Sequence, residues 1–311
     1  MRVAILLAVC WLAGTCNADQ AQPALDEVVV TGERAGPGMW RVHRGAANVW
    51  ILGSISPLPR DITWRSKQTE RVLESTSQVL VQKPLEISVP RILWIMLFDR
   101  KLLMVRHGKL KDVMPADLYS RFVIQRDKVT DDPTKWERYR PIIAAAFLQQ
   151  AAFHQVNLSM RLDLGAALRT LAKKHGVRVE EVNVAGVSDM LEALKTMSPQ
   201  TEAVCVRASL STVESGLPRL LERAQAWAGG NVERIENSPE LKEVDECRGA
   251  LDAGAGALDV ITRIRQTWLT RIEKYLQAPG TTIAVVNLDM LLERGGLLEQ
   301  LRNQGYEVDA P

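Results

Sequence analysis

The chain has 311 residues, of which 24% are charged and 46% are hydrophobic, and its formal net charge is +2. This composition is that of an ordinary globular protein and excludes a disordered or fibrous chain. Lysine and arginine alternate with aspartate and glutamate instead of forming basic runs, so the sequence does not favour nucleic-acid binding.

The amino terminus has the pattern of a secretory signal peptide. A basic residue precedes an uncharged apolar run over residues 3–14, and the small side chain of Ala18 offers a peptidase cleavage point, with Ala21 and Ala24 as alternatives. A retained membrane anchor is the competing interpretation, but the run is shorter than the roughly 20 residues that span a bilayer. We therefore expect a signal peptide over residues 1–18, a periplasmic or secreted protein, and no membrane span after cleavage.

Two of the four cysteines follow the predicted signal peptide. Because Cys205 and Cys247 form an even set in an oxidising compartment, we predict a disulfide bond between them. A bond that closes a loop of this size stabilises a fold by roughly 4 kcal/mol in the chain-entropy model. Two buried free thiols are the alternative.

The mature chain begins with a segment rich in alanine, glutamine, proline and glycine. Its composition predicts a flexible tether over residues 19–38, followed by one domain over residues 39–311. The domain opens with two strand-like segments, residues 39–43 and 48–53, around a turn at Gly45. Together they predict a β-hairpin.

A helix and a buried strand come next. The apolar spacing predicts a helix over residues 64–77, and the run at residues 79–81 predicts a strand, which gives β-α-β order. Residues 92–105 are strongly apolar, but three charged residues interrupt them and would be costly in hydrocarbon. We expect a buried helix there, with Trp94 and Phe98 in the core.

The middle of the chain is predicted to be helical. Breaks are expected near Pro115, Pro133 and Pro141 of the region 110–171, because proline ends or interrupts helices. Further elements alternate: helices at 162–175, 191–227 and 258–276, and strands at 177–182, 283–286 and 305–308. The pattern predicts an α/β fold whose central sheet is built from β-α-β units with a large inserted helical section.

Both ends of the predicted domain match a known pattern. Residues 39–42 (MWRV) and 53–56 (GSIS) follow a tryptophan strand, a turn and a Gly-x-x-His motif. Residues 295–302 and 305–308 follow a closing helix and strand. With these motifs the chain resembles the TraB/GumN family, which is related to the Tiki metalloproteases and is often exported in bacteria.

The resemblance implies a site with two histidines and acidic partners, which this chain does not retain. Gly53 of the first motif is present, but its histidine corresponds to Ser56. The glutamate that ends the next strand corresponds to Gln82, and another acid to Asn183. We therefore treat Ser56, Gln82 and Asn183 as degenerate site positions.

The second histidine of the family is also replaced. Counted back from the closing helix, it corresponds to Met290, although a gap of one residue would bring Asp289 into that place. A serine hydroxyl stays protonated, a neutral amide binds metal weakly, and a thioether suits Cu(I). None of these groups replaces an imidazole or a carboxylate on Zn, Mn or Co.

These replacements indicate an exported protein without a cofactor that keeps the fold and has a binding or accessory role in the cell envelope. The alternative is a metal-dependent peptidase or hydrolase with replaced ligands, using Mn, Co or Zn. The sequence identifies neither a partner nor an oligomeric state. Four histidines are scattered without the spacing of a zinc site, and His154 is expected to be partly buried on a helix.

Overall fold

The computed structural model describes residues 36–64, 67–84, 88–160, 164–184, 186–236, 242–253 and 255–311. By its internal contacts the chain divides into two units, and these residues all belong to the second, Arg34–Pro311. The predicted signal peptide and the first 17 residues of the predicted tether, residues 19–35, lie outside the described residues.

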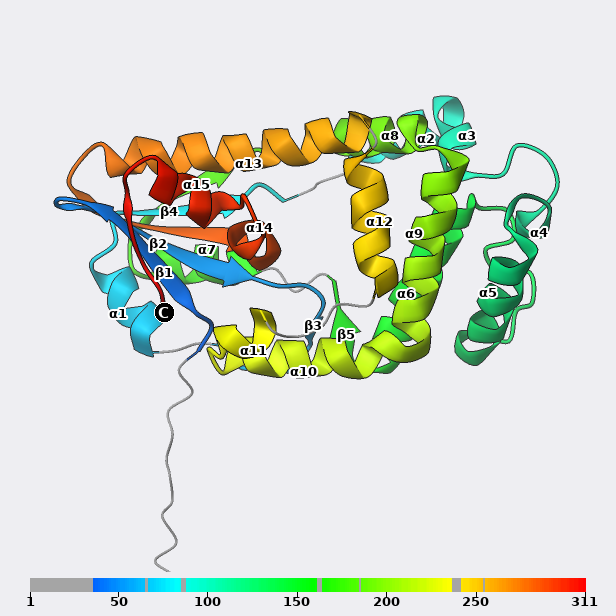
Figure 1. Cartoon of the computed structure of the whole chain (residues 1–311), viewed down its shortest axis with the longest axis horizontal. Coiled ribbons are helices and arrows are strands. Elements are labelled where there is room, and N and C mark those ends of the chain that lie inside the picture. The colour runs from blue at the N-terminus through cyan, green and yellow to red at the C-terminus, as the bar shows by residue number, and fades with distance from the viewer. Residues whose placement is uncertain are drawn as a thin grey trace, which may run out of the picture. The chain divides into compact units, whose positions relative to one another are not determined.

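A six-stranded mixed sheet occupies one half of this unit, on the left in Figure 1. Its strands are β1 (Met39–Arg44), β2 (Ala47–Ser54), β4 (Gln78–Gln82), β6 (Arg178–Val182), β7 (Gly280–Asn287) and β8 (Glu307–Asp309), in the spatial order β6-β4-β7-β2-β1-β8. Strands β2, β7, β4 and β6 are parallel, and β1 pairs antiparallel with β2 and β8. The predicted α/β class is confirmed.

The opening hairpin forms as its sequence indicates. β1 and β2 pair in register from Met39 opposite Leu52 to Arg44 opposite Ala47. Gly45 in the turn has a φ of 59°, in the left-handed region where a side chain is strained.

Helices fill most of the chain between the strands. They are α1 (Lys67–Glu74), α2 (Val89–Phe98), α3 (Arg100–Leu103), α4 (Leu110–Val113), α5 (Ala116–Val129), α6 (Pro141–Gln155), α7 (Leu164–Lys174), α8 (Val187–Thr196), α9 (Pro199–Ser211), α10 (Leu217–Ala228), α11 (Val232–Glu236), α12 (Lys242–Asp252), α13 (Ala255–Leu276), α14 (Leu288–Leu292) and α15 (Leu297–Asn303). Of these helices, α4, α5, α6, α9 and α12 lie to one side of the sheet (Figure 1). A short π-helix, η1 (Thr212–Gly216), joins α9 to α10. A separate two-stranded ribbon pairs β3 (Leu58–Pro59) with β5 (Leu158–Ser159). The inserted helical section predicted from the sequence thus lies before and after β6.

Prolines divide this section where the sequence indicates. α5 begins directly after Pro115, and α6 begins at Pro141, whose missing N–H is not needed in the first helical turn. α7 ends at Lys174, before Gly176 with a φ of 69°. These boundaries follow from local chemistry alone.

The apolar core has three parts. The largest contains the sheet and side chains from the helices around it, with Val79, Leu80 and Val81 of β4 fully buried. The second joins α4, α5, α6 and α9 around Leu118 and Phe122. The third is small and links α2 and α3 to α8.

The predicted burial of the apolar segment 92–105 is confirmed at Ile95 and Leu102 but is wrong for Trp94 and Phe98. The segment forms α2 and α3, and the exposed fractions are 58% for Leu93, 51% for Trp94, 74% for Leu97 and 59% for Phe98. High hydropathy made the helix a core candidate, but among its described side chains only Ile95 is buried, against α8. The other apolar side chains of α2 that the structure describes are exposed, because no neighbouring element in the described part of the chain covers them.

The predicted disulfide is confirmed. Cys205 of α9 and Cys247 of α12 are bonded, with their Cα atoms 4.7 Å apart and 42 positions between them in sequence. The bond fixes α12 against α9. No helix among the described residues is long and apolar enough to cross a bilayer.

Candidate functional site

The segments that the resemblance singles out lie after the carboxyl ends of the four parallel strands. Ser54, the last residue of β2, is opposite Asn287, the last residue of β7. Gln82, the last residue of β4, is opposite Val182 of β6. In sheets of this kind, ligands bind at the carboxyl edge of the strands.

Gly53 is required by packing next to this edge. A Cβ atom at Gly53 would lie 2.6 Å from Leu288 Cδ1 and 3.1 Å from Trp40 Cζ3, both in buried side chains. Its carbonyl oxygen accepts a hydrogen bond of 2.7 Å from Nε1 of the buried Trp227. The missing side chain of Gly53 therefore allows α14 to pack close to β2, and its carbonyl oxygen binds α10 to the same strand.

Ser56 stands in the loop that follows β2 and is exposed. Its hydroxyl Oγ donates a weak hydrogen bond of 3.5 Å to Met160 Sδ. The peptide bond between Ser56 and Pro57 is cis, and the loop leads into the β3–β5 ribbon. The hydroxyl thus faces the helical section, above the sheet edge.

The other degenerate positions have different surroundings. Gln82 and Asn183 are exposed at the ends of β4 and β6, and the Gln82 carbonyl oxygen accepts a hydrogen bond of 3.0 Å from Arg169. The side chain of Met290 packs against the main core, while its N–H donates to Asn287 Oδ1 over 3.1 Å. Asp289, one position earlier, lies in a cavity.

The cavity has a volume of about 920 Å³. Ser56 and Asp289 both line it, whereas Gln82, Asn183 and Met290 are not among the described residues of its wall. The other walls come from α6, η1, α10, α11 and α12. The volume is in the range of cavities that hold small organic ligands. The structure therefore brings together two of the positions derived from the resemblance.

Charged side chains of both signs line this cavity. Arg223 of α10 forms an ion pair with Asp289, and the neighbouring carboxylate of Glu293 pairs with Arg265 of α13. Arg219 lies one helical turn before Arg223 on α10, is exposed, and forms no ion pair with any described residue. Asp289 and Glu293 are held by guanidinium groups, whereas Glu236, a third carboxylate of this wall, forms no ion pair with a described residue. Arg219 is available to an anion.

These arginines were not among the site residues predicted from the sequence. Arg219 and Arg223 are four positions apart on one helix, a spacing that places them on one face. That spacing could have indicated a basic face on this helix. Arg248 of α12, which also lines the cavity, directly follows the disulfide-bonded Cys247.

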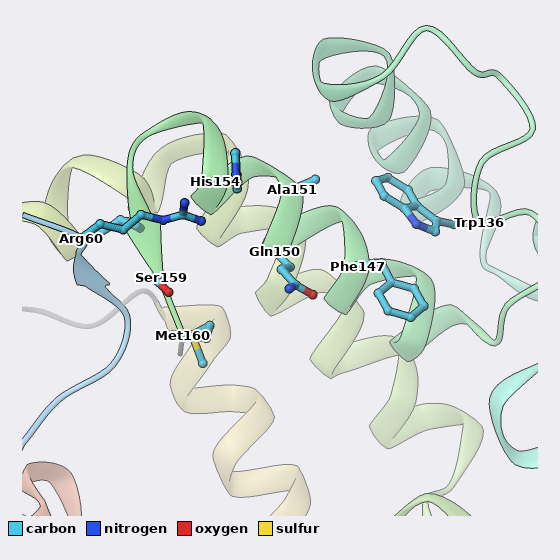
Figure 2. A pocket seen from close by; sticks show the side chains of 9 residues that line it. Arg60, Trp136, Phe147, Gln150, Ala151, His154, Ser159 and Met160 are labelled. Carbon is cyan, nitrogen blue, oxygen red and sulfur yellow. The ribbon is translucent and has the colours of Figure 1, made fainter. Parts of the chain in front are cut away.

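A second cavity, of about 500 Å³, shares Gln150 and Met160 with the first. Figure 2 shows Arg60 and His154 at one end of it, and Trp136 and Phe147 at the other. His154 is exposed, which corrects the expectation of partial burial. It is near the carboxyl end of α6, where the helix leaves the second core cluster.

His43, the histidine closest in sequence to the first motif, does not line either cavity. His43 is on β1, with its Nε2 atom 3.3 Å from Asp309 Oδ2 and 3.9 Å from Glu307 Oε2 of β8. Across the described part of the chain, no three or more histidine, cysteine, aspartate or glutamate side chains are grouped as a metal site would require.

Comparison with protein families identifies one match, which covers nearly the whole described domain. The model of the TraB/PrgY/gumN family matches residues 38–310. No curated protein and no solved structure matches the chain. The match extends from the opening strand through the carboxyl edge of the sheet to the last strand, so the chain belongs to the TraB/PrgY/gumN family.

Proposed function

We propose that this chain is a non-catalytic member of its family, exported to the cell envelope, that binds a ligand in the cavity at the carboxyl edge of the sheet. One observation carries the proposal. Ser56 and Asp289 line the same cavity, and the Asp289 carboxylate is paired with Arg223.

The chemistry of these groups argues against activation of a water molecule. A metal that activates water needs imidazole or carboxylate ligands, and a protonated serine hydroxyl does not replace them. Asp289 is a suitable ligand by type, but a metal would have to compete with the guanidinium of Arg223 for its oxygens. Glu293 is held in the same way by Arg265.

The same cavity is suited to binding an organic anion. Its wall combines apolar side chains such as Phe153, Leu220 and Leu292 with Arg219, which has no carboxylate partner among the described residues. Apolar walls with a few placed polar groups are typical of ligand sites. The disulfide between Cys205 and Cys247 supports export, because disulfides persist in oxidising compartments.

Thermal unfolding with EDTA, Mn, Co or Zn tests the non-catalytic assignment. A metal at 100 times its Kd adds about 2.7 kcal/mol to the free energy of unfolding, which raises the midpoint by several degrees. We expect no shift. A reproducible shift with one metal that is lost in Asp289→Asn would instead support a metal-dependent hydrolase with replaced ligands.

Native mass spectrometry of the protein purified from its own cells tests ligand binding. We expect a bound small molecule that is lost in Arg219→Gln and kept in Arg234→Gln, which changes an exposed arginine of α11 that is not part of the cavity wall. Absence of a bound species from the wild type, or equal loss in both variants, would contradict binding in this cavity. The intact mass also tests export, since we expect residues 1–18 to be missing.

A further inference from the structure

Helix α2 presents a continuous group of exposed apolar side chains. These are Val89, Leu93, Trp94, Leu97 and Phe98, which we call the α2 patch. The rings of Trp94 and Phe98 are in contact, with their centroids 4.2 Å apart. Large apolar side chains that gather in this way, and not singly, mark an interaction surface.

The helix is attached to the domain by its opposite side. Ile95 of α2 and Leu102 of α3 are buried against Val187 and Leu191 of α8, and Figure 1 shows these helices next to one another. Among the α2 side chains that the structure describes, only Ile95 belongs to this small cluster. The exposure of the α2 patch is therefore a property of a helix that is packed in place.

Basic side chains follow α2 in sequence, beginning with Arg100 and Lys101 of α3. A surface pocket of about 670 Å³ beside α3 is lined by five of them, which we call the basic rim: Arg100, Lys101, Arg106, His107 and Arg138. Within the part of the chain that the structure describes, none of the five forms an ion pair. Asp112, the nearest carboxylate of α4, accepts a hydrogen bond of 2.8 Å from the Lys109 N–H.

We propose that the α2 patch and the basic rim dock the protein on the surface of a bilayer that contains anionic phospholipids. Leucine and aromatic side chains of an interfacial helix enter the boundary between headgroups and acyl chains, and arginine and lysine beside them attract lipid phosphates. α2 has 10 residues, so it is too short to span a bilayer and is suited to lie in its surface.

Charge selects this occupant over a second copy of the chain. A twofold contact that aligns two α2 helices in parallel would bring the two basic rims together, and the like charges would repel; an antiparallel contact would leave both rims without an acidic partner, since the α2 patch contains no carboxylate. An anionic bilayer satisfies the patch and the rim at the same time. This surface is separate from the cavity, so its role does not depend on the proposed ligand binding.

Vesicle flotation of the full chain tests the proposal, using phosphatidylcholine vesicles with and without phosphatidylglycerol. We expect binding to the anionic vesicles and its loss at high salt. Leu97→Ser removes the most exposed side chain of the patch and is expected to weaken binding about tenfold. Arg100→Glu with Lys101→Glu is expected to weaken it roughly 30-fold or more, since each basic residue near an anionic leaflet contributes about fivefold.

Two matched variants keep the test specific. Ile124→Ser removes an exposed apolar residue of α5, and Lys173→Glu with Lys174→Glu reverses two adjacent exposed charges at the end of α7. All variants share the same amino-terminal segment, so any contribution of residues 1–35 to lipid binding cancels. We expect both control variants to bind as the wild type does.

Three results would overturn the proposal. One is that the wild type does not float with anionic vesicles. Another is that the control variants lose as much binding as the α2 and rim variants. The third is a concentration-dependent dimer in sedimentation experiments that Leu97→Ser abolishes while vesicle binding persists, which would make the patch an interface between copies of the chain.

Discussion

Arg223 of α10 and Asp289 at the start of α14 form an ion pair in the wall of the cavity that Ser56 also lines. The two residues are 66 positions apart, so the contact depends on the complete domain. The side chains are 20% and 42% exposed, which means that water still reaches the pair.

This exposure sets the expected strength of the pair. Arg223→Gln and Asp289→Asn are each predicted to lower the free energy of unfolding by less than about 1 kcal/mol, with a coupling energy below about 1 kcal/mol. Urea unfolding of the two variants and the double variant measures the coupling. The highly exposed pair Lys242–Glu246 of α12 is a control with an expected coupling near zero. A coupling of several kcal/mol would contradict the partial exposure of the two side chains.

The disulfide is expected to contribute more than any ion pair. Replacing Cys205 and Cys247 by alanine is predicted to lower the free energy of unfolding by about 4 kcal/mol, because the unfolded chain loses a closed loop. Denaturant unfolding with and without dithiothreitol provides the measurement. The reductant should destabilise the wild type to a similar extent and leave the double alanine variant unchanged. A wild type that does not respond to the reductant would argue against the bond.

Gly53→Ala tests the packing at the end of β2. The added methyl group meets Leu288 and Trp40, and we predict a loss of about 1–3 kcal/mol, typical of an overpacked core. Gly249→Ala is the matched control, because Gly249 lies in α12 with no neighbour within 4 Å of the new Cβ atom. In a helix that change is expected to stabilise by roughly 0.5–1 kcal/mol. Thermal unfolding of both variants should show opposite signs.

The contribution of Asp189, in the first turn of α8, to the free energy of unfolding is expected to depend on pH. A hydrogen bond of 2.7 Å from the Gly186 N–H, and then the nearby charge of Arg263, lower the pKa of this carboxyl from its ordinary value of 3.8. Because the pKa is lower in the folded state, the stabilisation is complete above the ordinary value and is lost as the pH falls below it.

The measurement compares wild type with Asp189→Asn by urea unfolding between neutral pH and pH values below the ordinary carboxyl pKa. We expect the stability advantage of the wild type to disappear at the acidic end. Arg263→Gln should show the same trend with a smaller amplitude, since the largest cause, the Gly186 N–H, remains. A difference that does not change with pH would contradict the assignment.

Local chemistry accounts for the parts of this fold that the sequence predicts well. The β-branched run of β7 indicates a central strand, and the prolines before α5 and within α6 set the helix boundaries. Cys205 and Cys247 could be paired because they are the two cysteines that follow the predicted signal peptide. The positions after β2, β4, β6 and β7 could be placed at one edge, because parallel strands end on the same side.

The features that could not be predicted from the sequence depend on long-range packing. Hydropathy is a property of the segment, but burial needs a neighbouring element, and among the described side chains of α2 only Ile95 has one. The approach of Arg223 to Asp289 depends on how α10 packs, which no local pattern contains. The exposure of His154 likewise depends on where α6 ends relative to the second core cluster.

The bond between Cys205 and Cys247 has a further consequence. The sheet takes no residue from α12, whereas the cavity wall takes Val244 and Arg248 from it. A cell that makes this protein without oxidising it would therefore be expected to hold molecules with a normal sheet and an unfinished cavity. Oxidation would then act as a maturation step, which separates the time at which the chain folds from the time at which it can bind.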